Sequence, residues 1–212
     1  MPNKNNSPYS AAVTGCGFMF DEMNSILPLL MHPDGKEKIK EEIVKNEYLK
    51  MNTEKTRKRA VAEFVRRYNA VPASFWEAYL QMSEEAKLIA MFFVLLKTYR
   101  ILFDFHINVT VNNWQHVSQS VDLDDIKVCI NDIAANDEFV DSWSDETKRR
   151  VGSFYLTFLR RIGMLGPNST KLVPLSLPAE DFAFYIKCGE DWFLDACLLQ
   201  PYEINNIRTY AL

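Results

Sequence analysis

The stretch Ser83–Phe105, SEEAKLIAMFFVLLKTYRILFDF, decides the fold of this 212-residue chain. Ser83 is a candidate N-cap, and Glu84 and Glu85 place negative charge near the positive end of the helix dipole. Apolar residues then follow on nearly every side, as in a helix buried at the centre of a helical domain. The uninterrupted apolar run, Leu88–Leu96, is shorter than the about 20 residues of a membrane span. We therefore expect a core helix and no membrane partner.

The composition is that of an ordinary globular protein, with 48% apolar and 25% charged residues. Only seven glycines are present, which argues against a glycine-rich cofactor loop and against a turn-dense β fold. The net charge of −4 gives no overall attraction to nucleic acid. The four cysteines lie far apart without a CxxC pair, and the polar N-terminus MPNKNNSPYS lacks the apolar segment of a signal peptide. We expect a cytoplasmic protein with free thiols.

The helical patterns predict an all-α fold with two small helical subdomains around the buried central helix. We expect a flexible arm at residues 1–8, an N-terminal subdomain at 9–107, a β-branched and Asn-rich linker at 108–120, and a winged-helix-like subdomain at 121–212. Leu172-Val173 favours a strand, which allows a short β wing near the C-terminus. The pattern leaves residues 172–187 open between a hairpin and a helix.

Two helix–turn–helix-like units stand out in this pattern. The first, Lys36–Tyr68, carries eleven Lys and Arg against six Glu inside an acidic protein. The second is Leu123–Gly163, whose last helix is followed by a glycine turn. In such units the second helix enters the major groove while Lys and Arg hold phosphates. Solvated faces of two surface helices explain the same charge excess, so the pattern is generic.

The candidate phosphate contacts come from the second helix of each unit. Because three consecutive residues of a helix fan over about 200°, we expect only part of each set to bind. The candidates in the N-terminal unit are Lys55, Arg57, Lys58 and Arg59. Those in the C-terminal unit are Lys148, Arg149, Arg150, Arg160 and Arg161. The stretch from Pro178 to Glu203, by contrast, carries six acids against Lys187.

Signatures of catalysis and of cofactor binding are missing from the sequence. It contains no GxGxxG, Walker, HExxH or GxSxG motif. The three histidines lack metal-ligand spacing, and His106 is expected at a helix end or an interface rather than as a base. The acids Asp122, Asp124 and Asp125 favour the capped first turn of a helix over a Mg²⁺ site. We expect no catalytic residue, no cofactor and no metal.

The opening Tyr9-Ser10-Ala11-Ala12-Val13-Thr14, followed by Phe18 and Glu22, resembles the YSAG-T start of the BrxA family. The segments TEKTRKRAVAEFVRRY, YRILFDF and WSDETKRRVGSFYLTFLRRIGML follow in the family's order, and the resemblance spans about Tyr9 to Leu199. Ala12 stands where the family pattern has Gly. BrxA proteins are small NusB-like members of BREX bacteriophage-exclusion systems.

The resemblance implies an all-helical protein with a winged element that binds double-stranded DNA and works beside other BREX subunits. The first hypothesis is therefore a non-enzymatic DNA-binding component of a phage-defence complex. The second is a protein–protein adaptor in the same complex, whose basic helices and acidic tail meet partner subunits. RNA binding, suggested by the NusB likeness, is the third.

Overall fold

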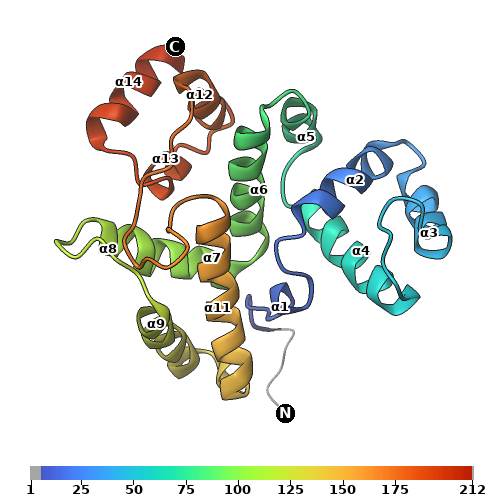
Figure 1. Cartoon of the computed structure of the whole chain (residues 1–212), viewed down its shortest axis with the longest axis horizontal. Helices are drawn as coiled ribbons and strands as arrows, with labels where there is room; N and C mark the ends of the chain where they lie inside the picture. The colour runs from blue at the N-terminus through green and yellow to red at the C-terminus, as the bar shows by residue number, and fades with distance from the viewer. Residues whose placement is uncertain (1–5, 212) are drawn as a thin grey trace. The chain divides into compact units, whose positions relative to one another are not determined.

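The computed structural model describes residues 6–211 and confirms the all-α prediction (Figure 1). Residues 1–5 of the expected arm lie outside the described residues. The N-terminal unit, residues 11–81, contains α1 (Val13–Cys16), α2 (Phe20–Met31), α3 (Gly35–Lys45), α4 (Glu54–Tyr68) and α5 (Ala73–Tyr79). The C-terminal unit comprises residues 82–211 together with residues 6–10. Its helices are α6 (Glu84–Thr98), α7 (Arg100–Phe105), the π-helix η2 (His106–Val111), α8 (Asn112–Trp114), α9 (Leu123–Asn136), α10 (Glu138–Asp141), α11 (Asp145–Arg161), α12 (Ala179–Lys187), α13 (Trp192–Ala196) and α14 (Pro201–Ala211).

The boundary between the two units differs from the expected one. The chain divides after Gln81, ahead of the core helix, whereas the sequence predicted a linker at 108–120. That segment is helical as far as Trp114, because Val109 and Thr110 are buried in the C-terminal unit. Tertiary burial here overrides the low helix propensity of β-branched residues and Asn.

The predicted core helix is confirmed, with one interruption. Ser83 caps α6 by accepting a hydrogen bond from the Ala86 N–H. Nearly all apolar residues of α6 are buried. Phe93 packs against the rings of Tyr185 and Phe193, with centroids 5.3 and 5.0 Å away. At Tyr99 the backbone is extended (φ −119°, ψ 101°), which separates α6 from α7. Within residues 6–211, no helix has both the length and the hydropathy needed to cross a membrane.

A buried hydrogen-bond network fixes α11 from its inner side. His106 Nε2 lies 2.7 Å from the Ala196 carbonyl oxygen, which can only accept, so Nε2 carries the proton. Nδ1 is then the acceptor, and the Tyr155 hydroxyl donates to it over 2.8 Å. The Thr110 hydroxyl in turn donates to the Tyr155 oxygen over 2.5 Å. The network joins η2, α11 and α13.

The expected β wing is reduced to two antiparallel bridges, Ser120 with Lys171 and Leu165 with Leu172. No strand forms within residues 6–211. Pro167 and Pro174 flank this segment and have no N–H to donate, so the pairing cannot extend into a ladder. The open question at 172–187 resolves to a helix over its second half, α12, which packs with α14.

Candidate nucleic-acid interface

The second helix of the N-terminal unit, α4, begins where the sequence predicted. Thr53 accepts a hydrogen bond from the Thr56 N–H as its N-cap. The connection from α3 to α4, residues 46–53, is longer than the three or four residues of a typical helix–turn–helix. Its conformation is held by the buried carboxylate of Glu42, which accepts from the N–H groups of Glu47, Tyr48 and Leu49.

Arg57, predicted as a phosphate contact, is instead bound within the N-terminal unit. Its side chain is buried, and Nε donates to the Ile43 carbonyl over 2.6 Å while Nη1 donates to the Met51 carbonyl over 2.8 Å. Arg67, on the same helix, is fully buried and donates to the carbonyls of Gly17 and Phe18. Both guanidinium groups are thus occupied by backbone carbonyls of their own unit, as expected for buried polar groups. The prediction for Arg57 is therefore wrong.

The other three candidates of α4 are exposed, and two of them have intramolecular contacts. Lys58 forms an ion pair with Glu54 at 2.5 Å, one helical turn away. Arg59 lies so close to Gly15 that a Cβ there would clash with its guanidinium. Lys55 is exposed and forms no ion pair with residues 6–211. Of the four candidates on α4, only Lys55 and Arg59 are thus exposed without an ion pair in the described part of the chain.

We expect Arg57→Ala to destabilise the protein by about 2–4 kcal/mol, because it removes the buried guanidinium whose hydrogen bonds to the Ile43 and Met51 carbonyls tie α4 to α3 and to the connection between them. Urea denaturation of this variant measures the loss. Lys55→Ala, on the same helix but exposed, is the control and is expected to change the free energy of unfolding by no more than about 0.5 kcal/mol. Unchanged stability together with a loss of DNA affinity in Arg57→Ala would restore the phosphate role.

The C-terminal unit offers a different arrangement on α11. At 3.6 residues per turn, four arginines fall on one exposed arc of about 120°. Arg149 and Arg160 form one row and Arg150 and Arg161 a second, each pair being eleven residues apart, or roughly 16.5 Å along the axis. All four are exposed, whereas the opposite side of α11 is buried. We call these four residues the arginine face.

Ser153 and Thr157 lie between the two ends of the arginine face. Neither Ser153 nor Thr157 stood out in the sequence. The Arg-Arg dipeptide, which recurs after eleven residues, is the sequence signal that predicts the two rows of the arginine face. Arg150, Arg160 and Arg161 form no ion pair with any residue in the described part of the chain. Their charge is therefore available to an external anion.

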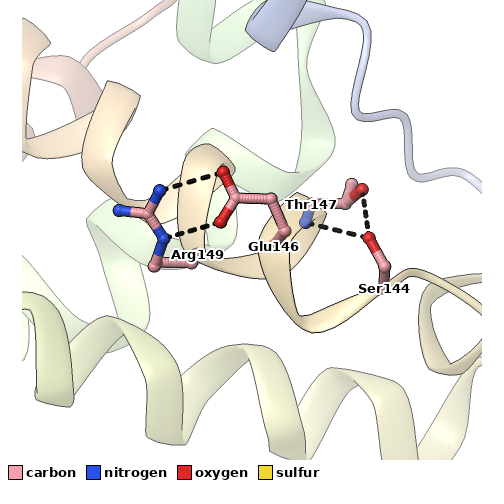
Figure 2. Close-up of polar contacts among 4 residues, drawn as sticks. All are labelled: Ser144, Glu146, Thr147 and Arg149. Carbon is pink, nitrogen blue, oxygen red and sulfur yellow. Dashed lines mark hydrogen bonds and ion pairs between the residues drawn. The ribbon is translucent and has the colours of Figure 1, made fainter.

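Arg149 is partly neutralised by Glu146, the acid that shares its face (Figure 2). Its Nε and Nη2 donate to the two carboxylate oxygens of Glu146 over 2.8 and 2.9 Å. This bidentate pair lowers the pKa of Glu146 and raises that of Arg149. One turn earlier, Ser144 caps α11 by accepting from the Thr147 N–H. Because the pair is exposed, solvent weakens it, and an incoming phosphate can compete for Arg149.

Lys148 is turned away from the arginine face. Its side chain is 15% exposed and its ammonium group lies 3.9 Å from Asp141. It lines a groove of about 440 Å³ between α9 and α11, whose other charged residues are Asp124, Lys127, Asp145 and Arg149. The structure therefore groups Arg149, Arg150, Arg160 and Arg161, and separates Lys148 from them.

The fold and this surface define an all-α protein whose second unit exposes one arginine-rich helix. The chain belongs to the BrxA family, whose model matches residues 7–187. This confirms the resemblance of the Tyr9 opening and of the later segments. Membership of the family supports a role associated with BREX systems.

Among solved structures, the chain is similar to the crystal structure of an uncharacterized protein from Magnetospirillum magneticum. The two share 16% identity with a TM-score of 0.73, over 90% of this chain and 98% of that one. At this identity the likeness concerns the fold alone. No curated protein matches the chain at a significant level.

Proposed function

We propose that this protein is a non-enzymatic, cytoplasmic DNA-binding component of a BREX phage-defence system, which binds double-stranded DNA through the arginine face of α11. The observation that carries the proposal is the set of four exposed arginines on one arc, three of them without an ion pair in residues 6–211. Arg is the side chain best suited to phosphate, because its planar fork donates two parallel hydrogen bonds. BrxA is not known as a family of enzymes, which agrees with this assignment.

The spacing within the arginine face supports duplex DNA as the ligand. The two ends are roughly 16.5 Å apart, which exceeds the about 12 Å width of the B-DNA major groove. The ends can therefore reach phosphates on both sides of that groove, with the hydroxyls of Ser153 and Thr157 between them. A-form RNA has a deep and narrow major groove that does not admit such a helix. The geometry thus favours DNA over the RNA alternative.

The test is binding of the purified protein to a labelled random-sequence duplex over a series of salt concentrations. We expect log affinity to fall linearly with log salt, with a slope of about −3 to −4 for three or four phosphate contacts. A structured RNA of equal length is the competitor, and we expect it to displace the duplex poorly. Absence of duplex binding at low salt would overturn the proposal, and stronger binding of RNA would reassign the ligand.

A further inference from the structure

The C-terminal unit contains a groove that faces a different side of α9 from α11. It has a volume of about 710 Å³ and lies between α9, η2 and the segment at Pro8 and Tyr9. Tyr9 donates a hydrogen bond over 2.9 Å to the buried carboxylate of Asp104, which also pairs with Arg100, and this holds the segment in place. We call this cavity the α9 groove.

Part of the α9 groove is apolar, beside the side-chain amides of Asn108, Asn113 and Asn136, and we call this part its apolar floor. Val109, Val128 and Ile133 line it, and Val128 is 61% exposed. The exposed valine leaves apolar surface accessible in the groove.

The charges that line the α9 groove are all negative. They are the carboxylates of Asp125, Asp132 and Asp137, and no Lys or Arg lies among the described lining residues. Asp125 and Asp137 use an oxygen each to accept from the N–H groups of Asp122 and Val140. Asp132 is exposed, and although its backbone carbonyl accepts from the Asn136 amide, its carboxylate forms no hydrogen bond or ion pair within residues 6–211. The groove therefore combines apolar contact with uncompensated negative charge.

We infer that the α9 groove binds a basic amphipathic helix of a partner protein. Asp125 and Asp132 are seven residues apart, or about 10.5 Å along α9, with Val128 between them. A partner helix that lies along α9 with Lys or Arg at positions i and i+7 places its two cations at the same distance as the carboxylates of Asp125 and Asp132. The partner's residues i+3 and i+4 then contact Val128. This is the helix-in-groove mode of recognition, in which apolar anchors give affinity and charges fix the register.

A small cation such as a polyamine matches the charge but not the apolar floor. The groove's volume lies within the range of about 300–1,000 Å³ that is usual for ligand sites, but the groove is open and does not enclose a small molecule.

The inference does not depend on DNA binding, because the arginine face of α11 contributes no residue to the α9 groove, apart from sharing the same unit of the chain.

The probe is a fluorescein-labelled, alanine-based helical peptide with lysine at every seventh position and two leucines between successive lysines. Its binding to the full-length protein is measured by fluorescence anisotropy. We expect Asp132→Lys to weaken binding at least about tenfold, because it replaces an attraction by a repulsion in the groove. The matched control is Asp124→Lys, which makes the same charge change on the groove between α9 and α11. We expect the control to weaken binding by about twofold or less.

Val128→Ser tests the apolar floor without a change of charge, and we expect it to weaken binding about threefold to tenfold. Circular dichroism confirms that each variant is folded. The inference is overturned if the unmodified protein does not bind the peptide at low salt, or if Asp132→Lys and Asp124→Lys weaken binding equally. It is also overturned if Val128→Ser has no effect while spermidine displaces the peptide, because the site would then take small cations.

Discussion

Replacing Arg150, Arg160 and Arg161 together by alanine is expected to reduce the affinity for duplex DNA by about 10²- to 10³-fold at 0.1 M salt. Each phosphate contact releases a counterion and contributes about 0.9 to the salt slope, so the slope should become shallower by about three. The loss should be similar for all duplex sequences, because phosphate contacts carry no base information. Anisotropy titrations at several salt concentrations measure both quantities.

The control removes an equal charge from another exposed helix, through Lys36→Ala, Lys38→Ala and Lys40→Ala on α3. An equal loss in both triple variants would show that net charge rather than the arginine face determines binding.

Glu146→Gln gives a test in the opposite direction. It releases Arg149 from its bidentate partner and removes a negative charge, so we expect affinity to rise about threefold to tenfold.

Acidification from pH 6.5 to pH 4 is expected to lower the free energy of unfolding by about 3 kcal/mol through His106 alone. Burial lowers the pKa of His106 from 6.5 to about 4, although its hydrogen bond to Ala196 opposes the shift. Below pH 6.5 the unfolded chain therefore binds a proton that the folded protein does not. The free energy of unfolding therefore decreases as the pH is lowered from 6.5, and the loss from this residue is complete about one pH unit below the folded-state pKa of about 4.

Carboxylates also titrate near the lower end of this range, so the contribution of His106 is obtained by difference. His106→Gln should be less stable than the unmodified protein at pH 7 by about 1–3 kcal/mol, because the Gln amide does not place its acceptor and donor where the two ring nitrogens bond Tyr155 and Ala196. Its stability should depend less on pH between 4 and 6.5. An NMR titration that shows His106 protonated near pH 6.5 in the folded protein would contradict the prediction.

Periodicity and capping residues predicted most of the helices of this protein. The caps Thr53, Ser83 and Ser144 each accept the expected backbone hydrogen bond, and Asp122 forms a capping box in the expected first turn. These features depend on neighbours three or four residues away, which a sequence displays directly. The π-helix η2 did not follow from local pattern, because the burial of its residues depends on contacts with α11 and α13.

The candidate interface was predicted only in part, for a related reason. All nine basic candidates look alike in the sequence, yet Arg57 donates to two carbonyls whose positions depend on the loop at 46–51. Lys148 and Arg149 are adjacent, but the rotation of about 100° between them leaves the Lys148 side chain 15% exposed and the Arg149 side chain 59% exposed. Whether a basic residue is free therefore depends on the loops and helices around it, which local pattern does not specify.

The position of α9 has a thermodynamic consequence. This helix packs against α11 on one side and forms the wall of the α9 groove on another. A peptide that tilts α9 on binding would also move the helix that carries the arginine face. Linkage then requires reciprocity: whatever factor the peptide applies to the affinity for DNA, DNA applies to the affinity for the peptide. A partner protein could thus regulate DNA binding without touching DNA.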